Sequence, residues 1–157
     1  MVVCTVCAVN IAGCGDSGGS QTLTFQTVEK ASTHFGSNSP IAEGVYVIRT
    51  NPDWSLFWSN INAYLLVTPP LPLVDFNQNT IIALVDANRS TGGYSITVTG
   101  VRTTVDGVAV EAVQQSPGAF CAVDQAFEQP YHIIKIPDFS GGASLNLHRT
   151  VLECPTP

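Results

Sequence analysis

Charged residues are scarce in this 157-residue chain, and their scarcity argues against several classes of protein. They make up 11% of the sequence, whereas Thr, Ser, Val, Gly and Asn are plentiful, which is typical of β structure rather than of long surface helices or disordered tails. The six Lys and Arg residues are scattered singly between Lys30 and Arg149. Nucleic acids and anionic lipids are bound by clustered basic side chains, so we expect neither a nucleic-acid site nor a basic lipid-binding patch.

Motifs for catalysis and metal binding are missing as well. The sequence contains no G-x-S-x-G elbow, no phosphate-binding loop and no H-E-x-x-H pair. His34, His132 and His148 are far apart, and none lies at a short metal-ligand spacing from another His, Cys or carboxylate. We therefore expect no metal, no cofactor and no enzymatic activity.

The first fourteen residues have the pattern of an export signal. Residues 2–13 are mostly apolar, and Ile11-Ala12-Gly13-Cys14 resembles a bacterial lipobox, whose cysteine is acylated and becomes the new N-terminus. Such a run is too short to cross a bilayer as a helix, which takes about 20 residues, so residues 1–13 are predicted to be a lipoprotein signal peptide. No basic residue precedes Lys30. Either the true start lies upstream of Met1, or the segment is a buried apolar strand.

The remaining chain divides into a tether and one domain. Residues 14–21 are polar and rich in glycine and are predicted to be flexible, and residues 22–157 are long enough for a single β-rich domain. With lipid on Cys14, the domain would be attached to a membrane of the bacterial cell envelope.

Five cysteines are present, and three of them lie in or next to the predicted signal. Only Cys121 and Cys154 fall in the domain, and two cysteines in an oxidising compartment predict one disulfide, contributing about 2–4 kcal/mol of stability. Two buried thiols are the alternative. A small hydrolase using Cys121 with His132, or a Ser–His pair, is the enzymatic alternative.

Alternating and apolar runs recur at intervals of roughly 8–12 residues with turn residues between them. They predict a mainly β fold, a single antiparallel β-sandwich or partly open barrel. Asp106-Gly107 is a strong hairpin signal between two alternating runs. The last strand is long enough to need a bulge, because Leu145 and Leu147 share a face with Arg149. The expected strands are 23–29, 44–50, 74–76, 80–85, 94–101, 101–105, 108–113, 131–136 and 143–153.

One short helix, at about residues 52–64, is expected to pack on the sheets. Asn51 suits the N-cap, and Pro52 suits the first helical position. Trp54, Phe57, Trp58 and Ile61 follow at helical spacing and are more typical of a core than of a ligand-stacking surface. The prolines at positions 69, 70 and 72 end the helix and make a stiff connector.

The strongest candidate for a binding site is the loop Asn88-Arg89-Ser90-Thr91-Gly92-Gly93-Tyr94, between an apolar run and an alternating one. Two adjacent glycines tolerate positive φ and leave the backbone uncovered, so another protein could approach closely. We refer to residues 88–94 as the recognition loop. The alternative is a structural turn that seats Tyr94 at the start of its strand.

Several of these features together resemble the C-terminal domain of the protease complex subunit PrcB family. The resemblance covers about residues 53–137 and rests on T-G-G-Y-S-I at 91–96, the hairpin at 106–107, and P-Y-H-I-I-K-I at 130–136. Such proteins are typically exported bacterial lipoproteins, and the named member is an accessory subunit of a surface protease complex. The resemblance implies a protein partner, an envelope protease being the candidate, and brings no catalytic residues.

The recognition loop is also similar, more weakly, to the N-P-T-T-G-Y loop of chagasin-type cysteine protease inhibitors. That loop lies between strands of an immunoglobulin-like sandwich and enters a protease cleft. Arg89 and Ser90 stand in place of its Pro and Thr, and no R-P-W loop follows. On the basis of this similarity, inhibition of a cysteine protease is the alternative to an accessory role.

Overall fold

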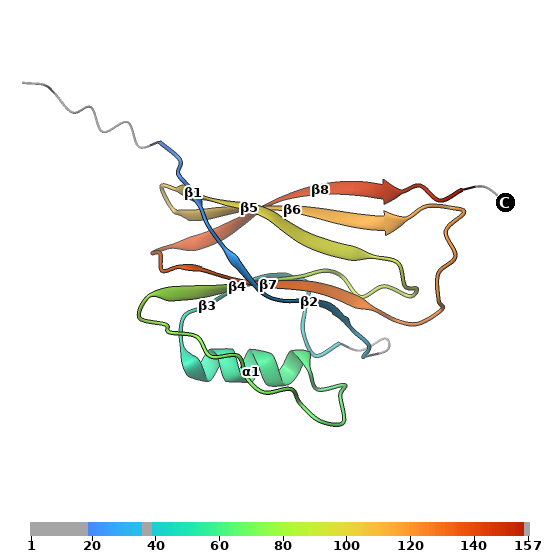
Figure 1. Ribbon diagram of the computed structural model, residues 1–157, viewed down its shortest axis with the longest axis horizontal. Coiled ribbons are helices and arrows are strands. Elements are labelled where there is room, and N and C mark those ends of the chain that lie inside the picture. The colour runs from blue at the N-terminus through green and yellow to red at the C-terminus, as the bar shows by residue number, and fades with distance from the viewer. Residues whose placement is uncertain (1–18, 36–38, 156–157) are drawn as a thin grey trace, which may run out of the picture.

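Two β-sheets and one helix form three stacked layers (Figure 1). The computed structural model describes residues 19–35 and 39–155, so the predicted signal peptide and Cys14 lie outside the described residues. The first sheet contains, in spatial order, β1 (Thr22–Leu23), β5 (Ser95–Thr104), β6 (Gly107–Pro117) and β8 (Gly142–Leu152). The second contains β2 (Gln26–Thr33), β7 (Gln129–Pro137), β4 (Asn79–Val85) and β3 (Gly44–Ile48). The expected β-sandwich with one packed helix is confirmed.

The central strands of the second sheet are buried on both faces. In β4, Ile81 and Ala83 face the helix, while Ile82 and Leu84 face the first sheet. This position between two layers explains why β4 reads as a continuous apolar run rather than an alternating one. The same holds for β7, where Ile133 faces the helix, while Ile134 and Ile136 face the first sheet.

Helix α1 (Asn51–Ile61) covers the outer face of the second sheet (Figure 1). Its stripe of Trp54, Phe57, Trp58 and Ile61 is buried, as predicted. The N-cap is Thr50, one residue earlier than predicted, because its side-chain oxygen accepts the Asp53 N–H at 3.3 Å. The helix also ends three residues earlier than expected, at Ile61, where the Asn62 side chain donates to the Trp58 carbonyl at 2.9 Å.

The proline-rich connector runs back along α1 and is fastened to it by the two tryptophans. The indole N–H of Trp54 donates to the carbonyl of Pro72, and that of Trp58 donates to the carbonyl of Pro69, each at 2.9 Å. The predicted strand at 74–76 is instead irregular, because the Asp75 carboxylate accepts the Asn77 N–H at 3.0 Å and bends the chain.

The first sheet contains one pairing that differs from the antiparallel arrangement expected. β5 and β6 form the predicted hairpin, but β6 and β8 are parallel. β8 follows β7, which belongs to the other sheet, so it enters the first sheet beside Gly107 and runs in the same direction as β6. The bulge predicted in β8 is absent from its register with β6, because the strand simply extends past the core, where Arg149 is exposed.

The predicted opening strand at 23–29 is divided between the two sheets. β1 pairs with β5 in the first sheet, and β2 pairs with β7 in the second. Leu23 and Phe25 pack against the core between the sheets, which accounts for their alternation. Within the part of the chain that the structure describes, no helix is long and apolar enough to span a membrane.

Candidate functional site

The recognition loop joins β4 of the second sheet to β5 of the first, so it closes one end of the sandwich (Figure 1). The chain enters the domain at the other end of β5, where the Gln21 N–H donates to the Thr103 hydroxyl at 2.9 Å. A strand rises about 3.3 Å per residue. The loop therefore lies roughly 30 Å from the point where the predicted tether ends and the domain starts.

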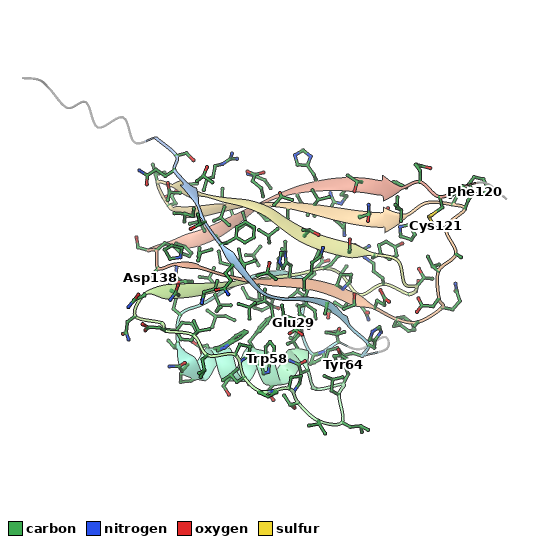
Figure 2. All side chains as sticks on the ribbon, in the orientation of Figure 1. Glu29, Trp58, Tyr64, Phe120, Cys121 and Asp138 are labelled. Carbon is green, nitrogen blue, oxygen red and sulfur yellow. A yellow bond between two sulfur atoms is a disulfide. The ribbon has the colours of Figure 1, made fainter. Side chains whose placement is uncertain are left out.

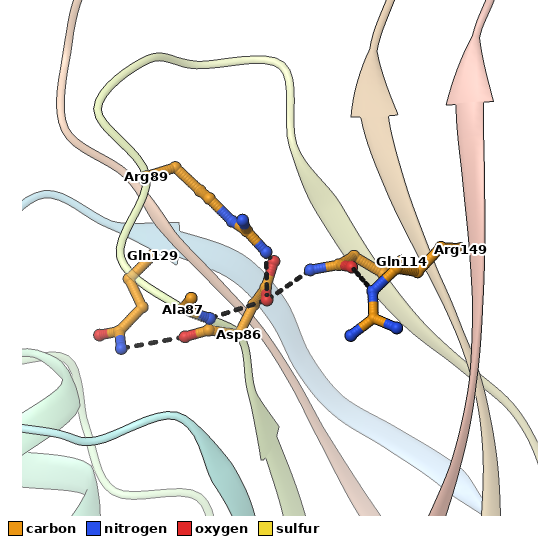
Figure 3. Close-up of polar contacts among 6 residues, drawn as sticks. All are labelled: Asp86, Ala87, Arg89, Gln114, Gln129 and Arg149. Atoms are coloured by element: carbon orange, nitrogen blue, oxygen red, sulfur yellow. Dashed lines mark hydrogen bonds and ion pairs between the residues drawn. The ribbon is translucent and has the colours of Figure 1, made fainter.

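A buried carboxylate anchors the start of the loop (Figure 3). Asp86 is 6% exposed, and its Oδ1 accepts hydrogen bonds from the Arg89 guanidinium at 2.8 Å and from the Gln114 amide at 2.6 Å. Gln114 in turn accepts from the Arg149 Nε at 3.1 Å. The network joins the loop to β6 and β8, and a buried charge with several donors is held far more rigidly than an exposed ion pair.

The segment 118–128 covers one side of the recognition loop. Arg89 and Glu128 exchange backbone hydrogen bonds of 2.7 and 3.0 Å, and the Gly92 N–H donates to the Asp124 carbonyl at 3.0 Å. The predicted disulfide between Cys121 and Cys154 is present and ties this segment to the end of β8, with the two Cα atoms 5.1 Å apart. Both connections restrict the motion of the loop.

The two glycines differ in exposure, and the expectation that both leave the backbone uncovered is wrong for Gly92. Gly92 is buried, because the Asp124 side chain lies against it where a Cβ would be. Gly93 is exposed and has a φ of +88°, which explains the need for glycine there. Asn88 and Ser90 are also exposed, whereas Arg89, Thr91 and Tyr94 are half-buried.

The start of β5 is stabilised from within the loop. The Arg89 guanidinium lies 4.8 Å from the centre of the Tyr94 ring, within the range of a cation–π contact. This geometry supports the alternative that the loop is a structural turn seating Tyr94. The exposed residues Asn88, Ser90 and Gly93 still form a candidate binding surface.

Two shallow depressions lie beside the loop, along the side of β8. One, of about 510 Å³, is lined by residues that include Arg89, Tyr94 and Arg149. The other, of about 300 Å³, is more apolar and includes Leu145 and Leu147. Both share Arg89 and Arg149, so a single ligand could extend across the two.

The candidates for nucleophilic catalysis do not form a site. Cys121 is in the disulfide and has no free thiol, which removes the thiol version of the hydrolase. His132 is 3% exposed, and its Nδ1 accepts the Val98 N–H at 2.8 Å. Its Nε2 must then carry the proton and donate it to the Thr27 hydroxyl at 2.9 Å, so the imidazole cannot act as a base toward Thr27. Burial lowers the pKa of His132 to about 4, with the nearby charge of Lys30 adding to the effect.

Other perturbed groups lie between β2, β7 and the end of α1, away from the loop. Burial raises the pKa of Glu29, although a hydrogen bond from Tyr131 acts in the opposite direction. Burial, together with the charge of Glu29, raises the pKa of both Tyr64 and Tyr131. Figure 2 shows Glu29 on the side of the second sheet that faces the helix. Among residues 19–35 and 39–155, no group of three or more His, Cys, Asp or Glu side chains could hold a metal ion.

Comparison with known proteins agrees with the resemblance seen in the sequence. Residues 80–137 match the family model described as PrcB C-terminal. The PrcB C-terminal match comprises β4, β5, β6 and β7, which are central strands of both sheets, and leaves out α1. No curated protein and no solved structure matches the chain significantly. The similarity of the loop to chagasin-type inhibitors is not shown, and the burial of Gly92 does not favour it.

The two motifs that carry the PrcB resemblance occupy structural positions. In T-G-G-Y, Gly92 packs beneath segment 118–128 and Gly93 supplies the positive φ. In P-Y-H-I-I-K, His132 bridges the two sheets through Val98. Sequence reasoning missed the roles of Asp86, Gln114 and Gln129, whose buried side chains organise the loop. Their only signal was a polar residue beside an apolar run.

Proposed function

We propose that this protein is a non-catalytic accessory subunit of a protease assembly in the bacterial cell envelope. The observation that carries the proposal is the match of residues 80–137 to the PrcB C-terminal family, a family of protease complex subunits. The described residues add no catalytic constellation, since Cys121 is disulfide-bonded and His132 has both ring nitrogens engaged. Binding is the activity that this scaffold supports best.

The binding surface in this proposal is the end of the sandwich that carries the recognition loop. The Asp86 network and the disulfide-linked segment hold the loop in place, so little conformational entropy is lost on binding. The loop also lies at the opposite end of β5 from Gln21. With a lipid anchor on Cys14, the loop would project away from the membrane and toward a partner.

Site-specific photo-crosslinking in the native envelope tests this proposal. Ser90 is exposed on the loop, and Asn77 is exposed in the turn before β4, at the other end of that strand. A crosslinker in place of Ser90 is expected to capture a peptidase or another subunit of its assembly, whereas one in place of Asn77 is not. Equal labelling of the same protein from both positions would contradict the proposed surface.

Lipidation of Cys14 is tested separately, because a protein without lipid would differ from the proposal in its location in the cell and not in its binding surface. A fatty-acid analogue supplied during growth is expected to label the wild-type protein and to leave Cys14→Ala unlabelled. Labelling that persists in Cys14→Ala would exclude Cys14 as the anchor.

A further inference from the structure

Within the described part of the chain, the outer edge of β8 is unpaired. β8 is the last strand of the first sheet and pairs there with β6 alone, from Gly142 opposite Gly107 to Leu152 opposite Pro117 (Figure 1). The pairing continues without a register shift over 11 residues of β8. A regular strand of this length has a second row of backbone groups on its other side.

Two hydrogen bonds identify which backbone groups face outward. At the start of β8, the Gly142 N–H donates to the Asp106 carbonyl, and at its end the Leu152 carbonyl accepts from the Gly118 N–H, each at 3.0 Å. Alternate residues of a strand direct their backbone groups to the same side, so the even-numbered residues bond to β6. The odd-numbered residues, whose N–H and C=O groups have no bonding partner within residues 19–35 and 39–155, are Ala143, Leu145, Leu147, Arg149 and Val151.

Most of the usual protections of an edge strand are absent from β8. The strand contains no proline, no lysine and no bulge, and its only charged residue is Arg149. Proteins commonly block exposed edges with such features, because an open edge accepts another strand. This edge is therefore suited to adding a strand from another chain.

The surface beside the edge indicates which side chains an added strand would carry. The depression of about 300 Å³ has a mixed lining, in which apolar side chains such as Leu84, Leu145 and Leu147 lie beside charged ones that include Glu43. The adjoining depression of about 510 Å³ contains Arg149, which has no carboxylate partner among the described residues and uses only its Nε, toward Gln114. Apolar side chains fit the first depression, and a carboxylate fits the free terminal nitrogens of Arg149.

On the basis of the proposed accessory role, we propose that β8 binds one extended segment of the partner protein as an additional strand of the first sheet. The inward side chains of this segment are apolar beside Leu145 and Leu147, and one acidic side chain reaches Arg149. A second copy of this chain fits less well, because its β8 contains no Asp or Glu to pair with Arg149. An antiparallel pair centred on Leu147 would instead place Leu145 opposite Arg149.

A crosslinking ladder tests strand addition. Ser144, Asn146 and His148 are exposed and lie on the outer face of β8, two residues apart. With a photo-crosslinker at each position in the full-length protein in cells, the three crosslinks are expected on one segment of one partner, at successive steps of two residues. That segment is expected to contain an Asp or Glu at the position next to Arg149.

A proline substitution tests the backbone contact without disturbing the pairing with β6. The Val151 N–H faces outward, so Val151→Pro removes only a group at the open edge, while Val151→Thr keeps that group. Val151→Pro is expected to retain the wild-type unfolding midpoint and to lower the crosslink yield from Asn146 about tenfold, which corresponds to one lost interaction of ordinary size. Val151→Thr is expected to crosslink as the wild type does.

The outcomes separate this inference from the accessory role on which it rests. Capture of a peptidase assembly from Ser90 without a two-residue ladder from β8 would overturn strand addition and leave the accessory role intact. A ladder on β8 of a second copy would overturn the choice of partner. Absence of crosslinks from both Ser90 and β8 would overturn both proposals.

Discussion

Replacement of His132 tests whether this side chain bridges the two sheets in its neutral form. In the folded protein its pKa is lowered to about 4 from an ordinary value of 6.5, mainly by burial. A histidine with a lowered pKa stabilises the fold fully above its unfolded pKa, and this stability is lost as the pH falls from 6.5 toward 4. Protonation must also break the hydrogen bond from Val98, because the charged ring has no acceptor nitrogen.

The expected loss of stability follows from the two pKa values. Full protonation would remove roughly 3 kcal/mol of the free energy of unfolding, and about 2 kcal/mol of this falls between pH 7 and pH 5. His132→Gln keeps a carbonyl oxygen that can accept a hydrogen bond and does not titrate. We expect this variant to be less stable at pH 7 by about 1–3 kcal/mol, but to lose about 2 kcal/mol less than the wild type between pH 7 and pH 5.

Urea denaturation of the purified proteins at both pH values measures this difference. His148→Gln is the matched control, because it makes the same substitution at an exposed histidine on β8. Glu29 titrates in the wild type and in both variants, so its contribution cancels in the comparison. If His132→Gln loses as much free energy as the wild type between pH 7 and pH 5, the neutral bridge is refuted.

Four further substitutions, one of them a control, test the turn at Gly107, the disulfide and the lipid anchor. Gly107→Ala would place a Cβ 2.0 Å from the Gly142 carbonyl oxygen at a φ of +139°, so chemical denaturation should show a loss of about 3 kcal/mol or more. Gly100→Ala, with its nearest contact at 3.6 Å, should cost about 1 kcal/mol or less; equal losses would contradict the close approach of Gly142 to Gly107. Cys154→Ser should lower the free energy of unfolding by about 2–4 kcal/mol, and an unchanged value would show that the disulfide does not stabilise the fold. Cys14→Ala should abolish fatty-acid labelling and partition into the detergent phase, and membrane association that survives would require another anchor.

Local sequence patterns predicted most of the elements because their physical causes are local. A continuous apolar run marked β4, the helical spacing of apolar residues marked α1, and Asp106-Gly107 marked the hairpin between β5 and β6. The aromatic stripe of α1 was assigned correctly to the core, since a helix face with two tryptophans must be covered. The cap was misplaced by one residue because Thr50 and Asn51 are both good N-cap residues.

Local sequence patterns could not predict which strands and side chains far apart in the sequence pair with each other. Nothing in the residues of β8 distinguishes a parallel neighbour from an antiparallel one, and its pairing with β6 depends on β7 lying in the other sheet. The burial of Gly92 likewise depends on segment 118–128 folding over the loop, which a glycine pair cannot reveal. The same applies to Asp86 and Gln114, which are 28 residues apart and meet only in the folded protein.

The structural role of the signature motifs affects where the binding surface should be sought. Gly92 and His132 are occupied within the fold, so substitutions there would alter stability first. The outward-facing positions Ser90 on the loop and Asn146 on β8 report on binding with less effect on the core. Stability and binding can therefore be separated by the choice of residue.

Size-exclusion chromatography of the detergent-extracted envelope tests the accessory role most directly. We expect the wild-type protein to elute in an assembly much larger than one chain, together with peptidase activity. We also expect Val151→Pro, once its wild-type unfolding midpoint has been verified, to elute apart from that activity. Elution of the wild-type protein as a free single chain, with the peptidase activity unchanged in cells that lack it, would contradict the accessory role.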